Sequence, residues 1–280
     1  MLTAMLLGLV TVQAPFDTTV SVHPDTRLEV IASAGSIDVT VWDRSDVRIV
    51  ARPERGARVE VMLDGAVLRV RARVPSGGID LVSYEITVPR RMNLTLGRND
   101  VDILVHGSEG SVDASITSGK ISIDGGRGTV SLRSFQGPIE LKNARGTVTA
   151  ESSLGPISMA DVVGDVEAKS NSNHLTLQNI DSRNLRATTV AGVIRFSGPV
   201  HENGRYALMT HSGSVFVRST VPINATISVA TVGGGFSTRL PYTVTEQRRK
   251  GIFTAKFGNG GAQVTMESFD GGLVVEEIKP

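Results

Sequence analysis

Apolar residues occupy every second position along most of this chain, and these alternating runs recur at a fixed spacing. Gly119, Gly137 and Gly155 lie 18 residues apart, and Asn173 continues the series. Apolar residues lie seven and five positions before each of the four, and two and four positions after it. Alternation with period two is typical of strands, and a fixed period near 20 residues indicates stacked units. Each repeat is therefore predicted to hold two strands joined by a four-residue corner.

The same template fits outside this stretch and gives ten copies in all. The residues at the third corner position are Gly35, Asn99, Gly119, Gly137, Gly155, Asn173, Gly192, Gly213, Gly234 and Gly271. Glycine and asparagine tolerate left-handed backbone angles. We therefore expect a left-handed residue at this point of each corner.

These repeats predict an all-β fold: a β-solenoid or β-helix with two strands in each coil of roughly 18–21 residues. A left-handed hexapeptide helix would need an aliphatic residue every six positions. Six and twelve residues after Val112 lie Ser118 and Asp124, so that period fails. A β-sandwich also has many short strands, but it does not require equal spacing. It is kept as the lesser alternative.

The template is interrupted twice. The first interruption runs from Thr40 to Arg91 and contains Asp64-Gly65 between two apolar runs, which predicts a hairpin. We expect antiparallel strands here that cap the first end of the repeats. The predicted organisation is a signal peptide over 1–14, an N-terminal β region with the first coils and the cap over 15–109, and repeats over 110–280. The second interruption is a C-terminal excursion over 239–261.

The first 14 residues resemble a secretory signal. They form an apolar run that ends in Val12-Gln13-Ala14, a small-x-Ala cleavage pattern, followed by Pro15. The run is too short to span a bilayer. We expect export to the periplasm or cell surface, a mature chain from about Pro15 and no transmembrane segment in it. The alternative is a buried first strand.

Aromatic and basic residues gather in the C-terminal excursion, although aromatic residues make up only 4% of the chain. Rings and arginines are common anchors of interfaces. The predicted partner-binding residues are Tyr242, Arg248, Arg249, Lys250, Phe253 and Phe257. The structural alternative is a hairpin whose rings cap the last coil, with the basic run as a solvated turn.

One inward column is polar. It consists of Ser134, Ser152, Ser170, Thr189, Thr210, Thr231 and Ser268. A hydroxyl ladder could bind a ligand, but hydroxyls beside tight corners commonly hydrogen-bond to the backbone. We expect the structural role.

The amino-acid composition excludes several classes of catalytic and metal-binding chemistry. The chain has no cysteine, so a disulfide scaffold, a thiol nucleophile and a Cys-ligated metal are excluded. The net charge is only +1, so the chain lacks the excess of basic residues that is typical of proteins that bind nucleic acid. The five histidines lack ligand spacing, and the outward columns alternate in sign without clustered carboxylates, which a glycosidase would need. No catalytic residue, metal or cofactor is predicted.

Several loose motifs together resemble a bacterial family of domains of unknown function called putative adhesins. They are the run Tyr84–Pro89 leading into Met92–Leu96, repeated units such as Ser134–Ile139, and Gly258-Asn259-Gly260-Gly261 before Gly271. The resemblance implies a β-helical, exported, envelope-associated module without catalytic residues, and some relatives are linked to adhesion or to envelope-stress signalling.

The expected function is therefore a non-enzymatic scaffold that binds an envelope protein or a surface glycan. A carbohydrate-active lyase or glycosidase and an envelope-stress signalling module are the alternatives.

Overall fold

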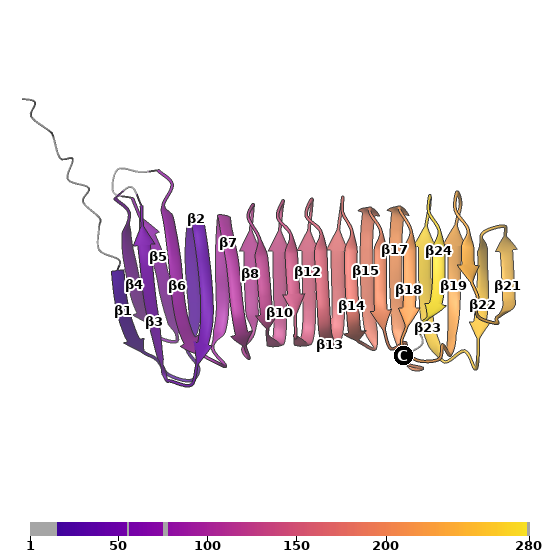
Figure 1. Cartoon of the computed structure of the whole chain (residues 1–280), viewed down its shortest axis with the longest axis horizontal. Helices are drawn as coiled ribbons and strands as arrows, with labels where there is room; N and C mark the ends of the chain where they lie inside the picture. Colours follow the sequence, from indigo (N-terminus) through magenta and orange to yellow (C-terminus); the bar gives the residue numbers. More distant parts are fainter. Residues whose placement is uncertain (1–15, 55, 75–77, 279–280) are drawn as a thin grey trace, which may run out of the picture.

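The computed structural model describes residues 16–54, 56–74 and 78–278, and every regular element in these ranges is a strand. The predicted signal peptide over 1–14 lies outside the described residues. The N-terminal strands are β1 (Phe16–Ser21), β2 (Arg27–Trp42), β3 (Asp46–Pro53), β4 (Arg58–Asp64), β5 (Val67–Arg73), β6 (Leu81–Pro89) and β7 (Asn93–Ser108). Figure 1 shows the strands side by side along the long axis of the molecule.

The central strands are shorter. They are β8 (Val112–Ile116), β9 (Ile121–Gly125), β10 (Arg127–Ser134), β11 (Ile139–Lys142), β12 (Arg145–Ser152), β13 (Ile157–Ser170), β14 (Leu175–Asp181), β15 (Asn184–Ala191), β16 (Ile194–Gly198), β17 (Arg205–Ser212) and β18 (Val215–Ser219). The last six are β19 (Ala225–Thr231), β20 (Phe236–Thr238), β21 (Thr243–Arg249), β22 (Ile252–Phe257), β23 (Ala262–Ser268) and β24 (Leu273–Glu277). The described ranges contain no helix long and apolar enough to cross a membrane.

Equivalent positions of successive repeats pair in parallel. Val130 on β10 lies beside Val112 on β8 and Val148 on β12. On the opposite side, Ile139 on β11 lies between Ile121 on β9 and Ile157 on β13. The side that contains β8, β10 and β12 is called the first row here, and the side that contains β9 and β11 is called the second row. The 18-residue offset read from the sequence is the register of these ladders.

The two rows close into a barrel, which corrects the predicted fold class. β7 pairs with both β8 and β9, and β13 pairs with both β12 and β11. The ring β7-β8-β10-β12-β13-β11-β9 therefore returns to β7, and all its ladders are parallel. The fold is all-β, but it is a closed seven-stranded parallel barrel with further strands outside it. The predicted β-solenoid with two strands in each coil is wrong.

The closure arises because backbone pairing continues through corners that the template treated as breaks. In β13 the ladder runs on through Arg145–Val163 and Gly146–Gly164 at the corner. In β7 the chain passes Gly97, which has a φ of 119°, without leaving the strand. β7 and β13 therefore belong to both rows as single strands, and this joins the rows into a ring.

Antiparallel strands lie outside the barrel at the N-terminal end. β1 pairs antiparallel with β3, and β3 with β6. β4 and β5 form the hairpin predicted at Asp64-Gly65, and the glycine has a φ of 55°. β2 runs through both rows: its first half pairs with β5 and its second half with β6. The outermost strand is thus β4 in the first row and β1 in the second.

At the C-terminal end, the spatial order of the strands differs from the chain order. β23 pairs in parallel with both β17 and β19, and β24 pairs with both β18 and β20. The last two strands therefore lie between strands made earlier, and Figure 1 shows yellow β24 beside orange β17, β18 and β19. β22 pairs antiparallel with β19, and β21 follows at the edge.

One apolar core runs between the rows. The inward columns predicted from the alternation, such as Leu132, Leu141 and Ile157, are fully buried. Burying an aliphatic side chain contributes roughly 1.5–3 kcal/mol, so many small contacts stabilise a core with few rings.

The polar column has the expected structural role at five of its seven positions, whereas the buried hydroxyls of Ser134 and Ser170 have no hydrogen-bond partner. Its members are buried, and the hydroxyls of Thr189, Thr210 and Ser268 donate to the carbonyl oxygens of Asn173, Gly192 and Gly213 over 3.0, 3.0 and 2.8 Å. These bonds join neighbouring corners.

The predicted reason for glycine at the short corners is wrong at most positions. Of the ten third-position residues, only Gly35, Gly119 and Gly213 have a positive φ. The glycines among the others, which are Gly137, Gly155, Gly192, Gly234 and Gly271, share close contact with the neighbouring backbone. A Cβ on Gly137 would lie 1.5 Å from the carbonyl oxygen of Gly119. Stacking of the corners, rather than left-handed geometry, excludes larger residues there.

Candidate partner-binding site at the C-terminal hairpin

The aromatic residues predicted from the excursion form one cluster. The rings of Tyr242 and Phe257 stack at 5.4 Å with an interplanar angle of 22°. The ring of Phe236 makes edge-to-face contacts with the rings of Tyr242, Phe253 and Phe257. The distances between ring centroids are 5.7, 5.5 and 6.5 Å. Such arrangements add about 0.5–1.5 kcal/mol per pair beyond burial. The cluster fixes the β21–β22 hairpin to the end of the sheet.

The three predicted rings differ in exposure. Phe257 is 1% exposed and Phe253 is partly buried against the core, whereas Tyr242 is 42% exposed. Phe257 and Phe253 therefore hold the hairpin in place, as in the structural alternative. Of the three predicted aromatic residues, Tyr242 offers the most surface to a partner.

The basic residues extend from this anchored base. Arg248 and Arg249 end β21, a strand whose residues are all exposed, and Lys250 lies in the turn before Gly251, which has a φ of 79°. The Arg248 Nε lies 3.0 Å from Glu246 Oε1, an exposed pair that fixes little. Three adjacent cations thus point into solvent at the hairpin tip.

Two hollows adjoin the hairpin over the first row. One of about 280 Å³ lies against Glu246, Arg248 and Phe253, and one of about 400 Å³ lies against Arg249, His211 and Phe269. Ile252 and Glu267 line both hollows. We call this combined surface, lined by His211, Glu246, Arg248, Arg249, Ile252, Phe253, Glu267 and Phe269, the hairpin groove.

The groove contains a stacked pair that sequence reasoning missed. The His211 and Phe269 rings stack at 4.9 Å with an interplanar angle of 10°, and the Phe269 side chain is 52% exposed. Each lies in a short corner, and the insertion of β23–β24 beside β17–β18 brings the corners together. All repeats share one template, so no sequence signal gave their spatial order.

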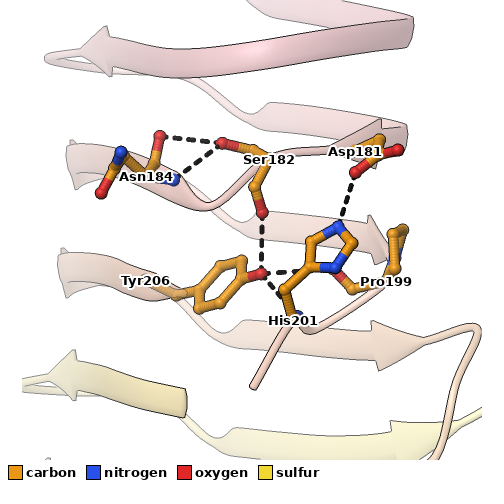
Figure 2. Close-up of polar contacts among 6 residues, drawn as sticks. All are labelled: Asp181, Ser182, Asn184, Pro199, His201 and Tyr206. Carbon is orange, nitrogen blue, oxygen red and sulfur yellow. Dashed lines mark hydrogen bonds and ion pairs between the residues drawn. The ribbon is translucent and has the colours of Figure 1, made fainter. Parts of the chain in front are cut away.

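A polar cluster around His201 contains the residue types of a catalytic arrangement, namely aspartate, serine, histidine and tyrosine (Figure 2). His201 Nε2 lies 2.6 Å from Asp181 Oδ1, and the Tyr206 hydroxyl donates to the Ser182 carbonyl oxygen over 2.8 Å. That hydroxyl also accepts from the His201 backbone N–H over 2.9 Å, and burial raises the pKa of Tyr206. The Ser182 hydroxyl is bound to the Asn184 backbone. Because the serine faces away from the histidine, this cluster fastens a loop and forms no nucleophile–base pair.

The outward charged columns show the predicted pattern of weak pairs between neighbouring strands. Lys120 Nζ lies 2.8 Å from Glu140 Oε2, and Arg133 lies between Asp113 and Glu151 at 3.7 and 3.9 Å. A hollow of about 450 Å³ over β12, β13, β15, β17 and β23 contains the carboxylates Asp165 and Glu167. Both carboxylates are exposed. Within the described ranges, no group of three or more acidic or histidine side chains could hold a metal ion.

No family model and no curated protein matches this chain. Several solved structures match over most of the length of this chain. A structure described as a putative adhesin from Bacteroides fragilis has a TM-score of 0.39 at 11% identity, and the match covers 95% of this chain and 98% of that one. A putative cell adhesion protein from Clostridium sporogenes has a TM-score of 0.25 at 11% identity, with 95% and 100% covered.

A structure described as a putative lipid binding protein from Parabacteroides distasonis has a TM-score of 0.33 at 8% identity, with 95% and 97% covered. Two of these three neighbours carry the adhesin or adhesion name that the sequence motifs indicated.

Proposed function

We propose that the protein is a non-enzymatic binding module of the cell envelope, and that the hairpin groove and its basic tip contact the partner. The main support for the proposal is that the β21–β22 hairpin is anchored to the core at its base and extends basic residues into solvent. Phe253 and Phe257 fix the hairpin, and Arg248, Arg249 and Lys250 extend from it beside exposed aromatic surface. Rings and arginines on a fixed base are suited to binding, because little side-chain and backbone freedom is lost.

The charge of the tip indicates the kind of partner. Three cations in sequence attract an anionic surface, and the exposed ring of Phe269 lines the same hollow as Arg249. An acidic surface glycan provides negative charge and sugar faces that can stack on rings. We therefore favour an acidic glycan of the envelope over an envelope protein.

Deletion of the whole excursion is a poor test, because Ala255 and Phe257 belong to the core. The sharper test is the triple variant Arg248→Ser, Arg249→Ser, Lys250→Ser, assayed on an immobilised acidic polysaccharide. Removing the three charges is expected to weaken binding about tenfold, roughly 1.4 kcal/mol, and to reduce its salt dependence.

The matched control is Arg91→Ser, Arg127→Ser, Arg145→Ser, which removes the same charge from exposed positions far from the hairpin. It is expected to bind as the unchanged protein does. Equal losses in both variants would show a nonspecific charge effect and refute the site. Polysaccharide cleavage that disappears with Asp165→Asn or Glu167→Gln would establish the enzyme alternative instead.

A further inference from the structure

A further hollow lies on the same side of the molecule as the hairpin groove. It has a volume of about 330 Å³ and lies over the first row, where β10, β12 and β13 end at their short corners. Its lining includes the exposed residues Arg133, Phe135 and Lys169 and the partly exposed Glu151. We call it the Phe135 hollow. The hollowed surface of the first row is therefore not confined to the C-terminal excursion.

One line of residues connects the Phe135 hollow to the hairpin groove. Each residue of this cross-strand line pairs with the next in a parallel ladder between neighbouring strands. The line consists of Arg133, Glu151, Lys169, Thr188, Met209, Glu267 and Ala230. The first three line the Phe135 hollow, and the other four line the larger hollow of the hairpin groove. Because β13 and β15 pair directly, no strand separates the two sites.

The surface along the cross-strand line is long and has an aromatic ring in each hollow. Neighbouring strands lie about 4.8 Å apart, so the six steps from β10 to β19 span roughly 29 Å. Phe135 lines one hollow and Phe269 the other, and each side chain is 52% exposed. Both rings directly follow a buried hydroxyl residue of the polar column, so they lie at equivalent corners. The two hollows therefore repeat one arrangement of ring and strand end.

Charges of both signs lie along the cross-strand line. Glu151 lies between Arg133 and Lys169, and the Arg133 Nε is 3.9 Å from Glu151 Oε2. In the hairpin groove, Glu267 lines the same hollow as Arg249. The two carboxylates would repel a polymer that is negative throughout. Sugar hydroxyls can donate to them, however, and sugar carboxylates can pair with the cations. The line therefore suits an acidic polysaccharide better than a uniform polyanion.

We propose that the acidic glycan is bound as an extended chain that crosses the strands of the first row, with the Phe135 hollow as its second subsite. This inference rests on the proposed function, because the hairpin groove is the first subsite. A chain held in the groove presents its further sugars to the Phe135 hollow at a high effective concentration. The affinity should therefore rise with the length of the glycan until the chain reaches both hollows.

The test measures the affinity of polygalacturonate fragments of graded length by isothermal titration calorimetry. The disaccharide is much shorter than the cross-strand line and fills one hollow, whereas long fragments reach both. Phe135→Ala combined with Lys169→Ser is expected to weaken the binding of long fragments about tenfold, because the second subsite is lost. The same variant should bind the disaccharide normally, because the hairpin groove is intact. The triple variant of the basic tip should weaken the binding of both.

The matched control combines Leu154→Ala with Lys142→Ser. It removes an exposed apolar side chain from the neighbouring short corner and an exposed lysine from β11, and neither residue lines the Phe135 hollow or the hairpin groove. The control is expected to bind every fragment as the unchanged protein does. Equal losses in the two double variants would overturn the proposal.

The outcomes separate the second subsite from the proposed function. If the tip variant weakens binding but affinity does not rise with fragment length, the second subsite alone is refuted. Normal binding of long fragments by the Phe135→Ala, Lys169→Ser variant has the same meaning. If the tip variant binds every fragment normally, the proposed function is refuted and this inference with it. An equal rise of affinity with length for inorganic polyphosphate would show that charge alone is recognised, which would overturn the assignment of a glycan.

Discussion

At the scale of single residues, the glycines of the short corners act through the atoms that they lack. The carbonyl oxygen of one corner occupies the space that a Cβ of the next corner would need, as Gly119 and Gly137 show. At other corners a buried hydroxyl donates to the same carbonyl oxygen that excludes the Cβ, as Thr210 does to Gly192 beside Gly213. Close stacking and hydrogen bonding of the corners therefore depend on each other.

Gly137→Ala should lower the free energy of unfolding by about 3 kcal/mol, because the new methyl group forces backbone apart in a packed ladder. Gly235→Ala is the matched control: a Cβ there would meet nothing within 4 Å. It should change stability by less than about 0.5 kcal/mol. Urea-induced unfolding of the two variants measures the difference. Equal losses would show that close stacking is not the cause.

Part of this could be predicted from residues alone. Strand side chains alternate with period two, so the burial of Val130, Leu132 and Ile139 followed from their spacing. The reason for glycine at the corners could not be predicted, because left-handed backbone geometry and close contact with a neighbouring backbone both favour glycine. The stacking of Phe269 on His211 could not be predicted either. The sequence of one repeat does not determine which other repeat packs beside it.

At the scale of elements, exposed ion pairs of arginine with aspartate or glutamate join the N-terminal strands. Arg48 pairs with Asp17 across β1 and β3, Arg52 with Glu85 across β3 and β6, and Arg90 with Asp43. Hydrogen bonds from these guanidinium groups lower the pKa of Asp17, Glu85 and Asp43 below the ordinary values. The pairs are therefore linked to acid stability.

A carboxyl group whose pKa is lowered in the folded state stabilises the fold at pH values above its ordinary pKa. This stabilisation is lost as the pH falls through the lowered pKa. The ordinary values are 3.8 for aspartate and 4.5 for glutamate. Amide exchange of β1 and β3 should therefore accelerate relative to β10 and β12 as the pH falls below about 4. After correction for intrinsic rates, a constant ratio between pH 7 and pH 3 would contradict this expectation.

The closure of the two rows into a barrel could not be predicted from the strand pattern of the sequence. The template correctly located the corners at Asn99 and near Gly164, but it treated each as a break between two strands. In the structure, pairing continues through β7 and β13, and this makes a closed barrel. Whether a corner keeps its ladder depends on the backbone of the neighbouring corner, which no single repeat contains.

At the scale of the whole molecule, the C-terminal strands are interior rather than terminal. Ala262, Met266, Leu273 and Val275 are fully buried between strands from earlier in the chain. In an ordinary repeat array, trimming the last unit leaves the rest intact. Here the same cut removes the contact between β17–β18 and β19–β20.

A chain that ends at Gly261 should therefore lose far more stability than one that begins at Val22 and lacks β1. The first cut opens the core on two sides, whereas the second removes an outer strand that pairs only with β3 among the described strands. Thermal unfolding followed by circular dichroism should show a large fall in Tm, or no cooperative transition, for the first chain. A greater loss from the second cut would refute this view of the C-terminal end.

The interior position of β23 and β24 also has a consequence for synthesis. A ribosome makes β19 to β22 before the strands that must lie between them and β17–β18. While the chain is still attached, the hairpin that bears Arg248 and Arg249 has no completed support, and the edges of β17 and β18 are unpaired. The core at this end therefore becomes complete only after β23 and β24 have been synthesised.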